Sequence, residues 1–130
     1  MRRIIGIGLL AIAIAAPAIA ADAAATIVKP PHGLKWVGRV IKKDFKKSLG
    51  HDNYVMAMCV ANRESHFHPK AYNPNSGASG VFQFIPSTWA WASQQAGYGG
   101  KSPFNAWANV GTAAWVVKND GWAPWGNHCP

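Results

Sequence analysis

The stretch of sequence that decides the fold runs from Cys59 to Trp89 and reads CVANRESHFHPKAYNPNSGASGVFQFIPSTW. Residues 53–61, which overlap the start of this stretch, predict a helix, because apolar side chains recur at spacings of three and four and Asp52 is placed as a cap. The following segment is rich in Pro, Asn, Ser and Gly, so it cannot continue the helix and is expected to fold back. Glu64, the only glutamate of the chain, therefore lies near the helix end.

This position gives Glu64 a chemical character. A carboxyl group between an apolar helix face and a folded-back loop is poorly solvated, and poor solvation favours its protonated form near neutral pH. A carboxyl group that keeps its proton is what a general acid requires. The sequence therefore predicts that Glu64 is a proton donor.

The first 20 residues are predicted to be a secretory signal peptide. Arg2 and Arg3 precede an apolar run, and Ala18, Ile19 and Ala20 form a small-residue cleavage site. The run is too short for a membrane-spanning helix, which needs about 20 residues, although an uncleaved anchor and cleavage after Ala23 or Ala25 are the alternatives. The chain then divides into a signal peptide at 1–20, a flexible lead-in at 21–33 and one domain at 34–130. A secreted protein, periplasmic or extracellular and associated with the cell wall, is expected.

Residues 34–49 predict an amphipathic helix with one cationic face, ended by Gly50. Removal of the signal peptide takes away two arginines and lowers the net charge from +8 to +6, and much of this charge lies on that helix. A solvated face is one interpretation, and attraction to an anionic wall or membrane surface is the other. No nucleic-acid motif accompanies the basic residues, so no nucleic-acid partner is expected. We expect a monomer.

Two cysteines in an exported chain predict one disulfide, between Cys59 and Cys129. The bond would tie the C-terminal tail to the helix that carries Glu64. Free thiols or an intermolecular bond are the alternatives.

The remaining elements are predicted from local signals. GVFQF, residues 80–84, predicts a short strand or extended piece, and a helix is expected to begin near Pro86 and end before Gly97. Ser102 and Pro103 predict the start of the last helix, with residues Trp107, Val110, Ala113, Ala114 and Val117 facing inward and Gly121 as its end. The fold class is mainly α, as four helices with a short loop or hairpin region after the Glu64 helix.

Together these motifs resemble a known family. Glu64-Ser65 at a helix end, then Gly80 to Gln83, then Asn109-Val110 in the last helix, is similar to the pattern of lytic transglycosylases of the lysozyme-like (α+β) fold. The cysteine arrangement, Ser87 to Trp89 and the terminal GWAPW also resemble the resuscitation-promoting-factor branch of that fold.

The resemblance implies cleavage of the β-1,4 bond between N-acetylmuramic acid and N-acetylglucosamine in peptidoglycan, with Glu64 as general acid and base and no cofactor. Glycosidases with two carboxylates set them about 5 to 9.5 Å apart. Asp52 precedes Glu64 by about 18 Å along one helix and cannot be the partner, and Asp44 and Asp120 cannot be placed from the sequence. A single acid favours a 1,6-anhydromuramic acid product; a bound water would instead make the same site a muramidase.

Four further residues are expected to bind the glycan. By position in the family pattern, Gln83 and Phe82 would contact a sugar, although Gln83 can instead satisfy loop backbone. Ser65 would orient Glu64 or the sugar, and Tyr72 would line the cleft or pack beneath the loop. The later cleft tyrosine of the family has no clear counterpart, and Trp115 is the nearest residue in the pattern.

The histidines and tryptophans allow weaker predictions. His66 and His68, with His128 and Cys129, are a possible zinc set, but a bonded Cys129 cannot ligate a metal, so we expect no metal and histidines that flank the cleft. Trp89, Trp107 and Trp115 are expected in the core. Trp91, Trp122 and Trp125 are left for surface roles.

Two other classes of function fit parts of the sequence. One is a non-catalytic wall-binding module on the same fold, and the other is a cationic membrane-active protein built on residues 34–49. The intact Glu64 with its matching loop argues against the first, and a helix held in a disulfide-tied domain argues against the second.

Overall fold

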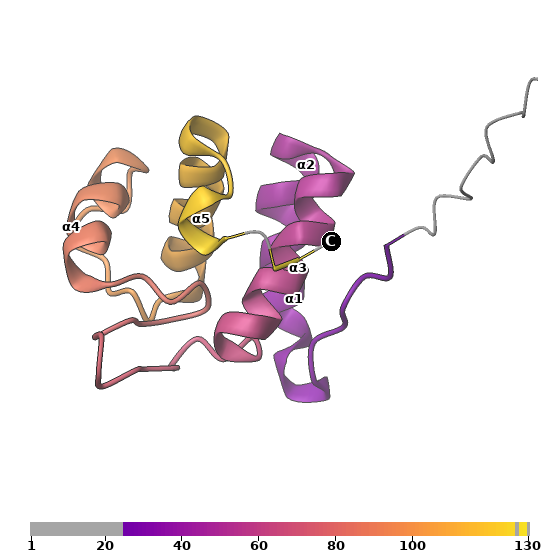
Figure 1. The fold of residues 1–130 in the computed structure, drawn as a ribbon, viewed down its shortest axis with the longest axis horizontal. Helices are drawn as coiled ribbons and strands as arrows, with labels where there is room; N and C mark the ends of the chain where they lie inside the picture. The colour runs from indigo at the N-terminus through magenta and orange to yellow at the C-terminus, as the bar shows by residue number, and fades with distance from the viewer. Residues whose placement is uncertain (1–24, 127, 130) are drawn as a thin grey trace, which may run out of the picture.

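The computed structural model describes residues 25–126 and 128–129, so the predicted signal peptide lies outside the described residues. Figure 1 shows a bundle of helices with a long loop between α3 and α4. The element order is η1 (His32–Leu34), α1 (Lys35–Ile41), η2 (Lys42–Lys46), α2 (Lys47–Leu49), α3 (His51–Ser65), α4 (Pro86–Gln95), α5 (Ala106–Asp120) and η3 (Ala123–Trp125). The prediction of a mainly α fold is confirmed. None of the helices among these residues has the length and apolarity needed to cross a bilayer.

The cationic helix predicted at 34–49 is present as one continuous helical stretch, α1, η2 and α2. Its middle, η2, is a π-helical turn. Gly50 ends the stretch with a φ of 90°, a conformation that glycine adopts without steric cost. Of the predicted lead-in, Ile27 and Val28 pack against the core. The domain boundaries stay predictions.

The glutamate helix is longer than expected at both ends. α3 begins at His51 with Gly50 as its cap, so Asp52 is not the cap but lies in the first turn, where its charge complements the helix dipole. The helix ends at His66 and Phe67, both in the left-handed region with φ of 50° and 65°. Because the fully buried Phe67 anchors this turn, the chain leaves α3 directly after Glu64 and Ser65.

GVFQF does not form a strand, which corrects the expectation of an extended piece. Ser79 pairs with both Tyr72 and Phe84 as isolated antiparallel bridges, and residues 80–83 make the turn between Ser79 and Phe84. Val81 and Phe82 are both fully buried, whereas neighbouring residues of a half-buried strand would point to opposite faces. The packing of both side chains therefore selects a turn.

The predicted bounds of α4 are confirmed, but the predicted start of α5, at Ser102 and Pro103, was wrong. α5 begins at Ala106, because the side chain of Asn105 accepts a hydrogen bond from Ala108 N at 3.1 Å and caps the helix there. The Ser102 hydroxyl instead accepts from Phe104 N in the preceding turn. Trp107 then lies beside the buried stripe of Ala106, Val110, Ala113 and Val117 and is 57% exposed, so its predicted core position was also wrong.

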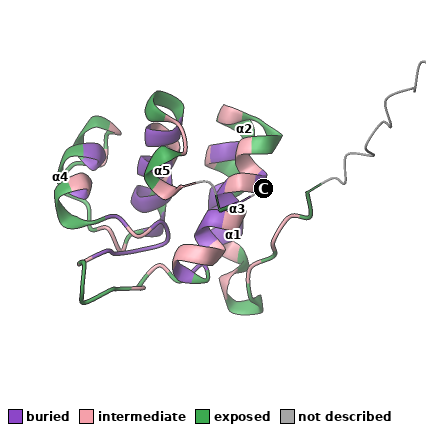
Figure 2. Ribbon diagram, viewed as in Figure 1, coloured by how far each residue is buried: buried purple, intermediate pink, exposed green. Residues whose placement is uncertain are grey.

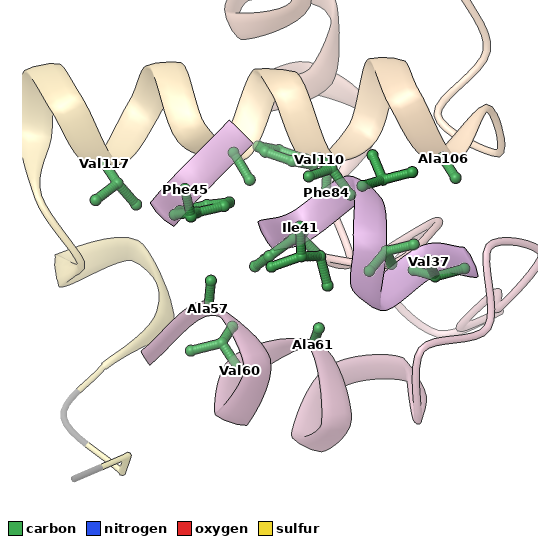
Figure 3. Close-up of a cluster of buried hydrophobic side chains, with 14 of the residues drawn as sticks. Val37, Ile41, Phe45, Ala57, Val60, Ala61, Phe84, Ala106, Val110 and Val117 are labelled. Carbon is green, nitrogen blue, oxygen red and sulfur yellow. The ribbon is translucent and has the colours of Figure 1, made fainter. Parts of the chain in front are cut away.

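The core lies where three helical segments meet. Figure 2 shows buried residues on the facing sides of α1, α3 and α5. Figure 3 shows that side chains from all three converge with Phe84 of the loop: Val37, Ile41, Phe45, Ala57, Val60, Ala61, Val110 and Val117. α5 packs against α1 and η2 on one side and against α4 on the other. Helix α3 and the loop are thus held on a common apolar base.

Candidate active site

Glu64 lies in the last turn of α3 and faces a cavity of about 330 Å³. Its side chain is 27% exposed, which makes it reachable from the cavity without leaving it fully in solvent. The cavity is lined by residues of the loop, α4, α5 and the tail: Phe82, Gln83, Phe84, Ile85, Thr88, Trp91, Val116, Asp120, Pro124 and Trp125. The loop and tail therefore create the space beside the glutamate.

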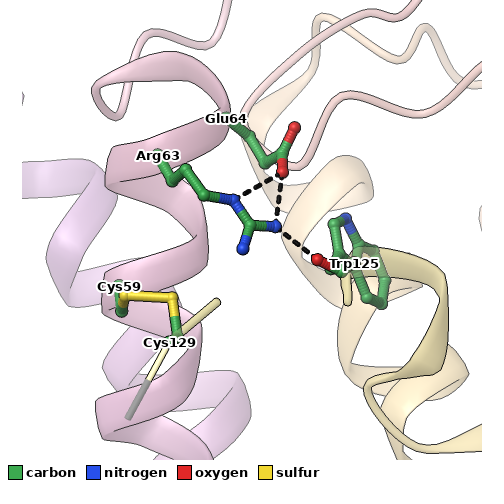
Figure 4. Close-up of a disulfide and its surroundings, with 5 residues drawn as sticks. All are labelled: Cys59, Arg63, Glu64, Trp125 and Cys129. Atoms are coloured by element: carbon green, nitrogen blue, oxygen red, sulfur yellow. Dashed lines mark hydrogen bonds and ion pairs between the residues drawn. A yellow bond between two sulfur atoms is a disulfide. The ribbon is translucent and has the colours of Figure 1, made fainter. Parts of the chain in front are cut away.

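The surroundings of Glu64 differ from the sequence expectation in one respect. The Arg63 guanidinium donates from Nε and Nη2 to Oε1 of Glu64, at 3.0 and 2.6 Å (Figure 4). We expected a carboxyl group with apolar neighbours, and the structure gives it a cationic partner. No described residue bonds to Oε2, so one carboxyl oxygen is held and the other is free to meet a ligand.

Arg63 also joins the glutamate to the C-terminal tail. Its Nη2 donates to the Trp125 carbonyl at 2.6 Å, and the Trp125 indole donates to the Phe82 carbonyl at 2.9 Å. The predicted disulfide between Cys59 and Cys129 is confirmed, with Cα atoms 6.0 Å apart (Figure 4). Helix α3, the tail and the loop are thereby connected around the cavity.

Ser65 is buried and holds the loop to the helix. Its hydroxyl lies 3.1 Å from the Ala61 carbonyl and 2.8 Å from the Val81 carbonyl, and it can donate to either. A side chain that is 6% exposed and occupied by backbone has little access to a sugar. These contacts favour a role in orienting Glu64.

Of the other three residues predicted to contact the glycan, Gln83 and Phe82 line the cavity and Tyr72 does not. Gln83 lines the cavity, while its Nε2 donates to the Ala71 and Gly80 carbonyls, so the backbone interaction left open by the sequence is present. Phe82 lines the cavity although its side chain is fully buried among aromatic rings. Tyr72 is 59% exposed, packs edge-on against Phe104 and does not line the cavity.

Neither of the two loop histidines lines the cavity. His66 and His68 are exposed on the turn that follows α3. Among the described residues there is no group of three or more His, Cys, Asp or Glu side chains that could hold a metal ion.

Asp120, which the sequence left unplaced, lines the same cavity as Glu64. It lies at the end of α5, where the negative end of the helix dipole disfavours a carboxylate, and no described residue forms an ion pair with it. Sequence reasoning also missed Arg63, Ile85 and Thr88. Of these, only Arg63 could have been found from the sequence, because it is a basic residue directly before the one glutamate.

These features define a small helical domain of the lysozyme-like class, with a glutamate at a helix end, a hairpin-like loop and a cavity between them. The family model of the transglycosylase SLT domain matches residues 41–120, and the chain belongs to that family. Membership of the resuscitation-promoting-factor branch stays a prediction.

Curated relatives carry a related name. The probable transglycosylase SceD of Staphylococcus aureus strains Newman and USA300 is 47% identical to this chain over 57 residues. The matched region covers 44% of this chain and 24% of each relative, so the chain spans about a quarter of the length of the relatives it matches. No solved structure gave a significant match.

Proposed function

We propose that this protein is a lytic transglycosylase that cleaves the β-1,4 bond between N-acetylmuramic acid and N-acetylglucosamine in peptidoglycan. The observation that carries the proposal is Glu64, the only glutamate, facing a cavity at the end of α3 in a domain of the SLT family. The names of the SceD relatives agree with this activity.

Glu64 serves as both acid and base in this proposal. Arg63 contacts Oε1, so Oε2 carries the proton to the glycosidic oxygen, the bond from that oxygen to C1 of the muramyl unit breaks, and N-acetylglucosamine leaves with a free 4-hydroxyl. The muramyl C6 hydroxyl then bonds to C1 and returns its proton to Glu64. The product is a 1,6-anhydromuramic acid end, and no water is consumed.

A hydrolytic muramidase is the second candidate, and Asp120 is the observation that favours it. Two carboxylates lining one cavity is the arrangement that glycosidases use to activate a water or hold a cationic intermediate. Under this mechanism Asp120 would be essential, whereas the single-acid mechanism needs only Glu64.

Digestion of purified peptidoglycan, followed by mass spectrometry of the sugar ends, separates the candidates. We expect anhydro ends from the wild type, no release from Glu64→Gln, and retained activity in Asp120→Asn. Reducing ends together with an inactive Asp120→Asn would establish the muramidase. Asp52→Asn, on the same helix as Glu64 but outside the cavity, is the matched control. Absence of any release by the wild type, with biological activity kept in Glu64→Gln, would leave a non-catalytic wall-binding module.

The cationic face of the first helical stretch is proposed to attract anionic wall or membrane polymers. A hollow there is lined by Arg39, Lys42, Lys43, Lys46 and Lys47. None of these side chains forms an ion pair with another described residue, and cations at this density attract polyanions. Binding to isolated walls should therefore weaken as salt rises, and replacing Lys42 and Lys46 with Gln should reduce that dependence. Such a role agrees with a site of action outside the cytoplasmic membrane, where the disulfide is stable.

A further inference from the structure

A second pocket lies between the first helical stretch and α5, outside the catalytic cavity. Its volume is about 280 Å³. It is lined by residues of η2, α2, α5 and the turn after α4: Asp44, Ser48, Leu49, Ala96, Tyr98, Gly111, Ala114, Trp115 and Lys118. None of these residues lines the cavity at Glu64.

Three polar groups meet in this pocket without a protein partner. Within the described part of the chain, no hydrogen bond or ion pair involves the Asp44 carboxylate, the Ser48 hydroxyl or the Tyr98 hydroxyl. Burial raises the pKa of Asp44 above its ordinary value of 3.8, and Lys43 offsets only part of the rise. A partly buried carboxylate that meets no donor among the described residues has its oxygens available to accept hydrogen bonds from a ligand in the pocket.

The local backbone is shaped to present these groups. Asp44 lies within η2, and single π-helical turns occur frequently at functional sites. Tyr98 packs against Gly111 of α5, where an added Cβ would come 2.4 Å from the tyrosine oxygen. Asp44 and Tyr98 both line this pocket, and burial and then the charge of Asp44 raise the pKa of the Tyr98 phenol. A glycine at position 111 is therefore required for the tyrosine to sit in this pocket.

An aromatic pair connects the pocket to the catalytic cavity. Trp115 lines the pocket, and Trp91 lines the catalytic cavity and is 53% exposed. Their rings meet edge to face with centroids 5.6 Å apart. A ligand that contacts Trp91 in the cavity can therefore continue over the pair toward Asp44.

The charges around the pocket select the class of ligand. Asp44 repels an anion, and Lys43 and Lys118 repel a cation. An apolar ligand would leave the carboxylate and both hydroxyls unsatisfied. A neutral molecule rich in hydroxyl and amide groups, with an apolar face for Trp115, satisfies all of these conditions, and a sugar ring has this chemistry.

We propose that the pocket at Asp44, Ser48, Tyr98 and Trp115 is a second sugar-binding site, which holds an N-acetylhexosamine unit of a glycan also engaged by the catalytic cavity. The Asp44 carboxylate and the two hydroxyls bond the polar groups of the sugar, and Trp115 covers one face. The identity of the ligand as wall glycan rests on the proposed function.

The test uses the full chain carrying Glu64→Gln and, as probe, the β-1,4-linked tetramer of N-acetylglucosamine. Nitrogen-15 labelled indole signals follow the two sites, with Trp125 for the catalytic cavity and Trp115 for the second pocket. Because Trp115 also contacts Trp91 of the catalytic cavity, the part of its shift that belongs to the second pocket is the part lost in Ser48→Trp. We expect both signals to move on titration. Asp44→Asn should weaken binding about tenfold, because it replaces a charged acceptor with a weaker neutral one, and Tyr98→Phe about fivefold, because it removes a hydrogen bond to the sugar.

Two further variants complete the test. Ser48→Trp, at an exposed position, should block the pocket without disturbing the core, and Asp52→Asn should leave binding unchanged. Unaltered affinity in Asp44→Asn and Ser48→Trp, or movement of the Trp125 signal with no movement of the Trp115 signal, would overturn the proposal. These outcomes are independent of peptidoglycan cleavage by the wild type, so failure of the second site and failure of the proposed function can be told apart.

Discussion

Asn109 is the side chain that joins the loop between α3 and α4 to α5. It is fully buried, accepts a hydrogen bond from Phe82 N at 2.8 Å and donates to the Ser79 and Pro103 carbonyls. Gly80 lies against it so closely that an added Cβ would come 2.3 Å from the Asn109 amide nitrogen. One amide group thereby fixes the turn that carries Gln83 beside Glu64.

Replacing Asn109 with Ala should destabilise the protein by about 3 kcal/mol, because it leaves the buried groups of the loop without partners. Chemical denaturation measures the change in the free energy of unfolding. Asn119→Ala is the matched control on the same helix, since Asn119 is exposed and bonds only to the Trp115 carbonyl; its cost should stay within about 0.5 kcal/mol. Equal effects of the two substitutions would contradict the role given to Asn109.

Asp44 predicts an unusual dependence of stability on pH. Burial raises its pKa in the folded state, so the folded protein holds the proton more tightly than the unfolded chain. The stability that this proton provides is fully present below 3.8 and is lost as pH rises through the raised folded pKa. At neutral pH the ionised carboxylate therefore opposes folding.

Asp44→Asn should accordingly raise the melting temperature at neutral pH, and the gain should shrink as pH falls below the ordinary carboxyl range. Thermal unfolding at about pH 7 and about pH 3 measures the difference between the two proteins. Asp52→Asn, which changes an exposed aspartate in the first turn of α3, should give no such gain. A destabilised Asp44→Asn at neutral pH would mean that the carboxylate has a partner within the fold.

At the scale of elements, local sequence signals such as capping residues, proline and glycine predicted which segments are helical. They predicted the exact ends of those helices less accurately. Pro86 and Gly97 bracket α4, and Gly50 and Gly121 end the helices before them, because proline and glycine act on their own turn. The sequence analysis placed the start of the last helix at Ser102-Pro103, whereas α5 is capped by Asn105. The choice depends on the buried stripe of α5, which is set by contacts with α1 and α4.

The start of α5 can be tested by replacing each of the two alternative cap residues, Asn105 and Ser102. Asn105→Ala should cost about 1 kcal/mol because it removes the acceptor for Ala108 N, whereas Ser102→Ala should cost less, since Ser102 bonds only within an exposed turn. Equilibrium unfolding of the two variants gives the comparison. The reverse order would place the helix start at Ser102.

Across the whole molecule, the disulfide closes a loop of 70 residues and keeps the tail at the cavity. Loss of the bond in the double variant Cys59→Ser, Cys129→Ser should lower stability by about 4 kcal/mol in the chain-entropy model. Activity on peptidoglycan should also fall, because Pro124 and Trp125 form one wall of the cavity and Trp125 holds Arg63.

Denaturant unfolding and glycan release measure the two effects. Wild-type protein treated with reductant should behave like the double variant, since the chain has only these two cysteines. Full activity in the reduced protein would show that the tail wall is held by its other contacts, such as the bond from the Trp122 indole to Asn53.

The sequence by itself determined the helical class, the order of the helices, the cysteine pair and the position of the one glutamate at a helix end, because each depends on residues near one another in the chain or on there being a single candidate. Only the tertiary structure decided the bond from Arg63 to Trp125, the three hydrogen bonds of Asn109 and the presence of Asp120 in the cavity of Glu64. These contacts join segments far apart in the chain. Their geometry follows from how the helices pack on the shared core, which no local pattern specifies.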